Sequence, residues 1–244
     1  MKDNFSGHAS DYAKYRPAYP HELITHLAGM APAHDLAWDC ATGNGQVAAV
    51  LTGYFAAVVA TDISAKQLRQ AAQLPNIIYK VEQAEQSSLA DNSVDLVVVA
   101  QAGHWFDFGP FYKEVQRVLR PKGIIALLGY GLVKTTPALN EVIEKLYSGL
   151  LANYWDPERR YIEEAYRTIP FPFQELEIPE FTINYSWTLE DLLGYLNTWS
   201  AVKHYEQHEG KNPVQLLEQE FREKWGPQQQ VAVQFKIISR IGQR

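Results

Sequence analysis

Two aspartates stand at the ends of two short apolar runs near the start of the chain. Asp39 opens the stretch "DCATGNG" at residues 39–45, and Asp62 follows "AVVAT". Gly43 and Gly45 lie just after Asp39, and glycines allow a ligand to approach the backbone closely. A glycine-containing turn between a strand and a helix is typical of sites that hold a phosphate group or a nucleotide-like cofactor.

The neighbours of the glycines separate three candidate ligands. A dinucleotide loop has the pattern G-x-G-x-x-G, whereas Ala41 takes the place of the first glycine here and Gln46 that of the third. A P-loop for a nucleoside triphosphate requires G-K-[ST], and no lysine lies between Asp39 and Lys66. The pattern therefore disfavours a nicotinamide dinucleotide and excludes a P-loop.

The charge of Asp39 favours the third ligand, S-adenosylmethionine. A carboxylate at the mouth of the turn repels a pyrophosphate but attracts an ammonium group, such as that of a methionine moiety. The two oxygens of Asp62 can accept hydrogen bonds from both hydroxyls of a ribose. The alternative for Asp62 is a helix cap, a role that Ser64 already fills. The two aspartates together with the two glycines predict an S-adenosylmethionine site.

Alternating apolar segments position these residues. The predicted strands between residues 35 and 131 are "LAWDC", "AVVAT", "NIIYKV", "VDLVVVA" and "IIALLGY". Helices are predicted after Gly45, from Ser64 in an S-x-x-Q capping box, and from Pro110 to Leu119, where "LRPKG" supplies stop signals. The order predicts an α/β fold with a doubly wound, mostly parallel, seven-stranded sheet.

The composition changes after this alternating region. Residues 133–229 contain aromatic-rich helical stretches, a strand-like run "ELEIPEFTINYSW", and a helix expected to start at Asn212 and Pro213. We expect one domain with an N-terminal lid and helix (1–33), a cofactor-binding core (34–132), a helical substrate cover with one strand (133–229) and a final strand (230–240). The aromatic side chains of the cover either line a substrate pocket or pack in an ordinary core.

The motifs resemble those of the class I S-adenosylmethionine-dependent methyltransferases. The similarity lies in "LAWDCATGNGQVAAVL", "VVATDIS" and "VDLVVVAQAGHWFD". In addition, "YAKYRPAYP" and "LRPKG" resemble the small-molecule branch that includes trans-aconitate and juvenile-hormone-acid methyltransferases. The resemblance implies methyl transfer from S-adenosyl-L-methionine to a small-molecule acceptor, with a carboxylate as one candidate. The family pattern has a glycine where this chain has Ala41, and we expect a gentler turn because alanine tolerates positive φ poorly.

The resemblance also assigns site residues. Those expected to bind the cofactor are Tyr12, Arg16, Asp39, Ala41, Thr42, Gly43, Gly45, Asp62, Ile63, Gln83, Ala84, Glu85, Gln101 and Ala102. Gln83 offers an amide to the adenine where the family usually has an acid. The substrate candidates are Tyr15, Trp105 and Trp199.

His104 is the candidate catalytic residue, with two possible roles. It acts either as a general base or only as a group that orients the cofactor or substrate. Methyl transfer depends mainly on alignment and exclusion of water, and a carboxylate acceptor needs no base. Arg16, Arg159 or Arg160 could clamp such a carboxylate, whereas the alternative for Arg16 is a partly solvated arm.

Composition limits the other classes of protein. The chain has 244 residues, a net charge of −6 and a single cysteine, Cys40. The negative charge argues weakly against a nucleic-acid partner, and one cysteine fits the reducing cytoplasm. The N-terminus lacks an apolar leader, and the longest apolar runs are strand-sized, so we expect no membrane partner. The oligomeric state is left open.

Two residue pairs have the spacing of sites known from other classes of protein. Tyr130 and Lys134 match the Y-x-x-x-K pair of short-chain dehydrogenases, but glycines on both sides of Tyr130 predict a strand end rather than a helix. His204 and His208 have the spacing of a zinc pair without a third ligand, so no metal site is predicted. The remaining alternatives are an NAD(P)-dependent oxidoreductase, a cofactor-binding protein without catalysis and a nucleic-acid methyltransferase.

Overall fold

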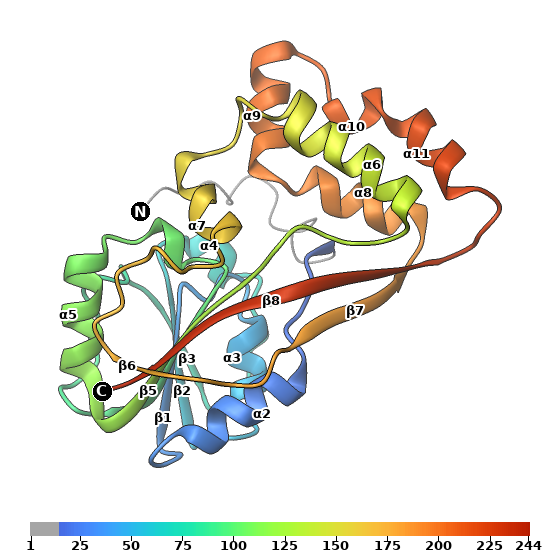
Figure 1. The fold of residues 1–244 in the computed structure, drawn as a ribbon. Coiled ribbons are helices and arrows are strands. Elements are labelled where there is room, and N and C mark those ends of the chain that lie inside the picture. The colour runs from blue at the N-terminus through green and yellow to red at the C-terminus, as the bar shows by residue number, and fades with distance from the viewer. Residues whose placement is uncertain (1–14) are drawn as a thin grey trace.

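An eight-stranded sheet forms the centre of the computed structural model, which describes residues 15–244 (Figure 1). The strands are β1 (Leu36–Cys40), β2 (Ala57–Asp62), β3 (Ile77–Val81), β4 (Val94–Ala100), β5 (Leu119–Tyr130), β6 (Gln174–Leu176), β7 (Thr182–Trp187) and β8 (Val231–Gln243). Their order is β3-β2-β1-β4-β5-β8-β6, with β7 also paired to β8. Strands β1 to β5 are parallel and β8 is antiparallel to its neighbours. The predicted doubly wound, mostly parallel α/β fold is confirmed.

Helices cover both faces of the sheet. Figure 1 shows α5 (Phe108–Val118) on one side and α2 (His21–Met30) and α3 (Gln46–Leu51) on the other. Along β4, Leu96 and Val98 join the apolar cluster under α2 and α3, whereas Val97 and Val99 join the cluster under α5. This burial on both faces explains why the sequence of β4 is almost entirely apolar.

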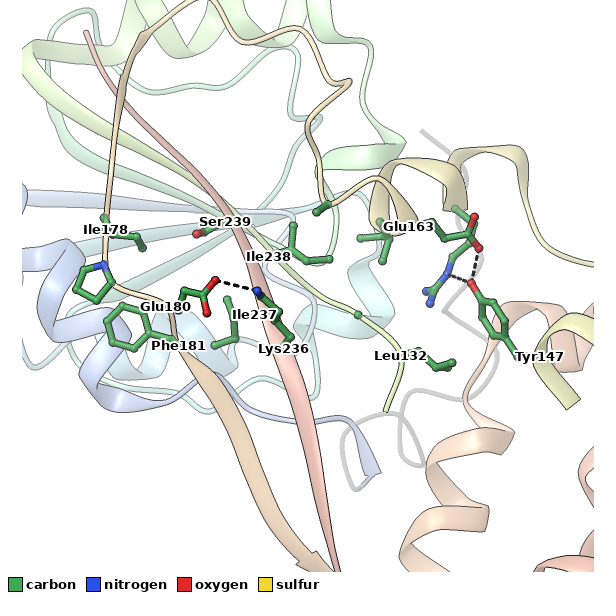
Figure 2. A pocket seen from close by; sticks show the side chains of 15 residues that line it. Leu132, Tyr147, Glu163, Ile178, Glu180, Phe181, Lys236, Ile237, Ile238 and Ser239 are labelled. Atoms are coloured by element: carbon green, nitrogen blue, oxygen red, sulfur yellow. Dashed lines mark hydrogen bonds and ion pairs between the residues drawn. The ribbon is translucent and has the colours of Figure 1, made fainter. Parts of the chain in front are cut away.

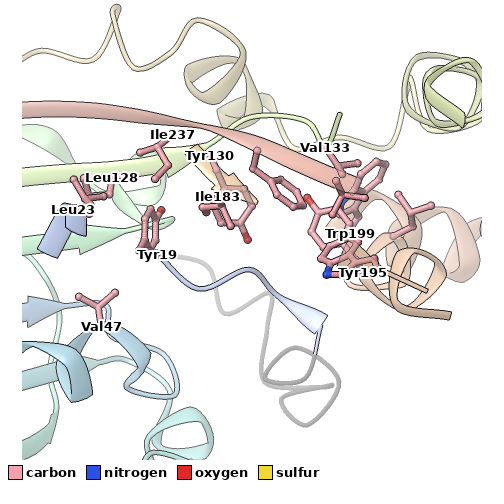
Figure 3. Close-up of a cluster of buried hydrophobic side chains, with 14 of the residues drawn as sticks. Tyr19, Leu23, Val47, Leu128, Tyr130, Val133, Ile183, Tyr195, Trp199 and Ile237 are labelled. Atoms are coloured by element: carbon pink, nitrogen blue, oxygen red, sulfur yellow. The ribbon is translucent and has the colours of Figure 1, made fainter. Parts of the chain in front are cut away.

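The predicted cover is a group of short helices beyond the carboxyl ends of the parallel strands. Its helices are α6 (Pro137–Glu144), α7 (Arg160–Glu163), α8 (Leu189–Asn197), α9 (Ser200–Glu209), α10 (Pro213–Leu216) and α11 (Glu218–Trp225). A π-helical segment follows α6 at Lys145–Leu150, and a 3₁₀ turn precedes α7 at Pro157–Arg159. Figure 3 shows one apolar cluster running from Leu23 and Tyr19, past Tyr130 on the sheet, to Tyr195 and Trp199 of the cover. The cover is therefore packed onto the sheet by a shared core.

The sheet has eight strands instead of the predicted seven because one predicted strand is interrupted. The run "ELEIPEFTINYSW" forms β6 and β7, both antiparallel to β8, with residues 177–181 between them. Pro179 lies in this gap and has no N–H to donate to a ladder. One predicted strand thus becomes two, and β8 extends to Gln243 rather than to residue 240.

The end of α5 differs from the prediction. Leu119 was expected in the helix, but it opens β5 and pairs with Val94. The register then shifts, so that Leu96 pairs with Ile124, and Lys122 in the bulge between them has φ +67°. The helix also begins at Phe108 rather than Pro110. The helix ends just before "LRPKG", as these stop signals predict. The five residues themselves belong to β5 and include its bulge.

Candidate functional site

The turn after β1 is built around the buried carboxylate of Asp39, which is 1% exposed. Its Oδ2 accepts hydrogen bonds from Thr42 Oγ1 at 2.5 Å and from Ala48 N at 2.9 Å. One side chain therefore fixes the turn and the first turn of α3. The other oxygen, Oδ1, is buried and has no hydrogen-bond partner among residues 15–244.

Burial raises the pKa of Asp39 to about 7, although the hydrogen bonds from Thr42 and Ala48 oppose this shift and the charge of Asp62 adds to it. A cation placed against Oδ1 would give the ionised carboxylate the partner that it lacks. The orphaned oxygen and the raised pKa both fit a site for a positively charged group.

Asp62 ties the turn after β1 to the turn after β2. Its Oδ2 accepts from Gly43 N at 2.9 Å and its Oδ1 from Ser64 N at 2.8 Å. Ser64 caps α4 (Ala65–Leu68) by accepting from Gln67 N at 3.3 Å. The prediction that Ser64 caps this helix is confirmed, and Asp62 is held at the carboxyl end of β2 beside the glycine turn.

The expectation of a gentler turn at Ala41 was wrong. Ala41 has φ +57°, and Gly43 and Gly45 have φ +59° and +80°. Alanine here adopts the left-handed conformation that the family's glycine would adopt without strain. A Cβ at Gly45 would lie 2.6 Å from the hydroxyl of Tyr79, whereas a Cβ at Gly43 would meet nothing within 4 Å. Packing against β3 therefore requires Gly45, and Gly43 presents open space to a ligand.

The residues predicted after β2 and β3 border the same edge of the sheet, because the carboxyl ends of parallel strands lie together. Ile63 is half-buried directly after Asp62, and Ala84 is buried. Gln83 is exposed, and Glu85 accepts a hydrogen bond from Asp107 N at 3.2 Å. These residues can form the wall of a cofactor site next to the glycine turn.

The segment after β4 carries Gln101, Ala102 and His104. Gln101 has φ +56°, and its backbone N–H donates to Leu128 O at 2.8 Å, which anchors the turn to β5. Ala102 is buried, and His104 lies in the 3₁₀ turn Gly103–Trp105 with only 8% of the residue exposed. Nδ1 of His104 lies 3.2 Å from the hydroxyl of Tyr166. The imidazole is therefore held in one orientation.

Burial, with the positive charges of Arg159 and Arg16, lowers the pKa of His104 to about 3. The ring is neutral at neutral pH. A group with so low a pKa is a weak general base, since the best bases have pKa values near the working pH. Of the two predicted roles, the low pKa disfavours proton removal, and the hydrogen-bonded ring is compatible with orientation.

A small cavity of about 40 Å³ brings several predicted residues together. It is lined by Arg16, Gln101, His104, Trp105, Trp155, Asp156, Arg159, Trp199 and Ser200. Sequence reasoning did not identify Asp156 and Ser200, because neither residue belongs to a chemical motif. Tyr12 lies outside the described residues. Tyr15 packs on α8 instead, where a Cβ at Gly194 would lie 2.5 Å from its ring.

Arg16 is an anchored arm rather than a solvated one. Its guanidinium donates to the Tyr130 hydroxyl at 3.3 Å and to Thr198 O at 3.1 Å, and lies 5.7 Å from the ring centroid of Tyr195. These contacts join the N-terminal segment to β5 and to the cover. The arginine is thereby fixed at the wall of the cavity.

Arg159 and Arg160 differ sharply. Arg159 lies over the rings of Trp155 (4.9 Å) and Tyr147 (5.5 Å) and donates from Nε to the Tyr147 hydroxyl at 3.1 Å. Arg160 is exposed and contacts Tyr161. Of these two candidates for a carboxylate clamp, Arg159 is the one in the cavity.

The dehydrogenase-like pair does not lie on a helix. Tyr130 lies in β5 and Lys134 in an isolated bridge to Gln234, so they do not share a helix face. Within residues 15–244, no group of three or more histidine, cysteine, aspartate or glutamate side chains is arranged to hold a metal ion. In the same residues no helix has both the length and the apolarity needed to cross a bilayer.

A doubly wound sheet with acids and a glycine turn at its carboxyl edge is a cofactor-binding fold, and comparison with known proteins defines the class. Residues 38–127 match the family model described as "Methyltransferase domain". The chain belongs to the class I S-adenosylmethionine-dependent methyltransferases. The alternative of a Rossmann-type oxidoreductase is not favoured.

Three similar proteins match most of the chain. A Dictyostelium discoideum protein named "Putative methyltransferase" is 34% identical over 203 residues, which are 82% of this chain and 77% of the relative. A solved structure described as a "Putative Type II Methyltransferase" from Anaeromyxobacter dehalogenans is 41% identical with a TM-score of 0.87, and the match covers 94% of this chain and 98% of that one. A Haemonchus contortus phosphoethanolamine N-methyltransferase in complex with S-adenosylmethionine shares the fold at 17% identity and a TM-score of 0.50, covering 98% of this chain and 57% of that one.

We expect Ala41→Gly to stabilise the protein by about 1 kcal/mol, because glycine removes the strain of a positive φ. Urea unfolding of the variant and the wild type measures the difference. The matched control is Ala49→Gly within α3, which should destabilise by about 0.5 to 1 kcal/mol. Equal destabilisation by both substitutions would show that Ala41 is not strained.

We expect Asp39→Asn to change how stability depends on pH. The pKa of Asp39 is about 7 in the folded protein and near 3.8 when unfolded, so between these values the folded state keeps a proton that the unfolded state releases. This group therefore lowers the unfolding free energy as pH rises from 4 to 7, by a total of a few kcal/mol. Asparagine can keep an oxygen acceptor for Thr42 and Ala48 but does not titrate.

Urea unfolding of both proteins at pH 5 and pH 8 tests this expectation. The stability of Asp39→Asn relative to the wild type should be higher at pH 8 than at pH 5. An identical difference at the two pH values would contradict the raised pKa.

Proposed function

We propose that the chain transfers the methyl group of S-adenosylmethionine to the carboxylate of a small organic acid. The observation that carries the proposal is the cavity lined by Arg16 and Arg159, which includes Gln101 just after β4, the strand paired with β1. When bound, S-adenosylmethionine supplies a methyl group activated on a sulfonium.

The cofactor side rests on the two acids. The buried Oδ1 of Asp39 would accept the ammonium of the methionine moiety, for which the orphaned oxygen and the raised pKa are the support. Asp62 would accept the ribose hydroxyls, and Thr42 and Gly43 belong to the turn that faces them. Ile63, Ala84 and Gln83 would receive the adenine through apolar surface and one amide, and Glu85 and Ala102 would complete the wall.

The acceptor side rests on charge. Two arginines and one acid, Asp156, line the cavity with the neutral His104. In the part of the chain that the structure describes, no carboxylate pairs with Arg159, whose polar partner is the Tyr147 hydroxyl. An arginine without an acid beside two aromatic rings is a ready partner for an anionic ligand. The cavity therefore favours a carboxylate over a neutral or cationic acceptor.

The neutral histidine agrees with this acceptor. A carboxylate oxygen forms the new bond to the methyl carbon while the bond from that carbon to sulfur breaks, and no proton has to be removed. His104 and Gln101 then orient the acceptor, and Trp105, Trp155 and Trp199 exclude water. Phenols, amines and thiols would need a base that a histidine with a pKa of about 3 does not provide.

We expect Asp62→Ala to weaken binding of S-adenosylhomocysteine by tenfold to a hundredfold, because each lost charge-assisted hydrogen bond costs roughly 1.5 to 3 kcal/mol. Isothermal titration measures the affinity, with NAD as the comparison ligand. Ser64→Ala is the matched control, since it removes the helix cap but no acceptor for the ribose. Unchanged affinity in Asp62→Ala would remove the ribose assignment, and binding of NAD instead would overturn the cofactor site.

We expect Arg159→Gln to lower kcat/KM for a carboxylic acid by about tenfold or more, the loss of one charge-assisted contact. Transfer of a tritium-labelled methyl group to benzoate, cinnamate, octanoate and decanoate measures the rate. Arg160→Gln is the control, because Arg160 is exposed and does not line the cavity. If no acid accepts a methyl group although S-adenosylhomocysteine binds, the carboxylate proposal is wrong.

A further inference from the structure

A second and larger cavity lies on the face of β8. It has a volume of about 560 Å³, and Figure 2 shows Lys236–Ser239 of β8 between its two sides, with Leu132 on the side of Tyr147. One wall carries Tyr147 and Glu163, and the other carries residues 178–181. The cavity is open because β8 lacks a regular outer partner between β6 and β7, where Pro179 interrupts the strand. We call it the β8 groove.

The lining of the β8 groove is apolar in the middle and polar at two ends. The apolar side chains are Leu132, Ile162, Ala165, Ile178, Pro179, Phe181, Ile237 and Ile238. At one end, the exposed pair Lys236 and Glu180 neutralise each other at 2.8 Å. At the other end, the Tyr147 hydroxyl accepts from Arg159 Nε at 3.1 Å and donates to Glu163 at 2.5 Å (Figure 2). A ligand in the groove would bury an apolar body with its polar end toward Arg159.

Arg159 lines both the β8 groove and the small cavity beside His104. Its guanidinium lies over the rings of Trp155 and Tyr147, which contact each other with centroids 4.7 Å apart, so this one side chain belongs to the walls of both spaces. The neighbouring hollow at Glu175–Ile178 and Ser239–Ile241 is of similar volume but shares no residue with the small cavity. Of these two larger spaces, the β8 groove is thus the one that shares a wall residue with the small cavity.

Size decides what the two spaces can hold. A single water needs about 10 to 15 Å³ of such volume, so the small cavity of about 40 Å³ admits a carboxylate but little more. Pockets that bind a whole small molecule span about 300 to 1,000 Å³, and the β8 groove falls in this range. An acceptor larger than its reacting group must place the remainder elsewhere, and the groove is adjacent and apolar.

We propose that the β8 groove binds the apolar body of the acceptor while its carboxylate lies beyond Arg159 in the small cavity. The acceptor is then an amphiphilic monocarboxylate with an aliphatic body. Arg159 is the specificity-determining residue at the junction. This inference rests on the proposed carboxylate methylation, and its test separates the two.

The test fills the groove from a position with room for a side chain. Gly131 lines the groove, a Cβ there meets nothing within 4 Å, and its φ lies outside the left-handed region. Gly131→Leu should therefore fold and occupy the groove, and an unchanged affinity for S-adenosylhomocysteine checks this. Gly149→Leu is the matched control, since Gly149 also has open space around it, is exposed and lies outside the groove.

The probes are acetate, hexanoate, octanoate and decanoate, examined by isothermal titration and by transfer of a tritium-labelled methyl group. In the wild type and in Gly149→Leu, kcat/KM should rise up to about fourfold per added methylene, the value for complete burial of that group. Gly131→Leu should lose this rise, with at least a tenfold higher KM for decanoate and correspondingly weaker decanoate binding.

The outcomes distinguish the groove from the reaction. If decanoate binds to the wild type, fails to bind to Gly131→Leu and is not methylated, the groove stands and the carboxylate chemistry fails. If both variants methylate decanoate as the wild type does, the chemistry stands and the groove is not the acceptor site. Absence of decanoate binding to the wild type also overturns the groove.

Discussion

The site depends on one constraint, which is that Asp39 must be buried as a carboxyl group at the end of β1. Its burial is unfavourable to the charged form, and hydrogen bonds from Thr42 Oγ1 and Ala48 N offset part of that cost. The same bonds fix the turn and the start of α3. Asp62 repeats the arrangement one strand away, where Gly43 N and Ser64 N both donate to it. Two acids therefore hold the two turns, and Gly43 presents open space between them.

Much of this arrangement could be predicted from the sequence because it is local. Apolar runs followed at once by Asp39 and Asp62 identify strands that end in acids, and parallel pairing brings those ends together. The cap residues Ser64 and Asn212 lie next to the helices that they begin, and both were predicted correctly. For both caps, the side chain and the backbone groups that donate to it are only two or three positions apart along the chain.

What the sequence could not show depends on contacts that are distant along the chain. His104 meets Tyr166 across 62 positions, and Arg16 meets Thr198 across 182, so no local pattern reveals either pair. The left-handed backbone at Ala41 violates a propensity that tertiary structure overrides. A loss of local strand pairing at Pro179 is foreseeable, but the groove that it opens depends on how the π-helical segment and α7 pack above β8.

The positive charges around His104 affect both the binding of an acceptor and the protonation of the imidazole. Burial lowers the pKa of His104, and the positive charges of Arg159 and Arg16 lower it further. The same two charges would attract an anion. A cavity with two arginines does not easily hold both an anion and a basic histidine, because each arginine that attracts the anion also disfavours protonation of the neighbouring imidazole. A nucleophile that needs deprotonation gains little from such a site. The carboxylate acceptor that we propose is already ionised and would be attracted by the same charges, so under this proposal binding and reactivity favour the same acceptor.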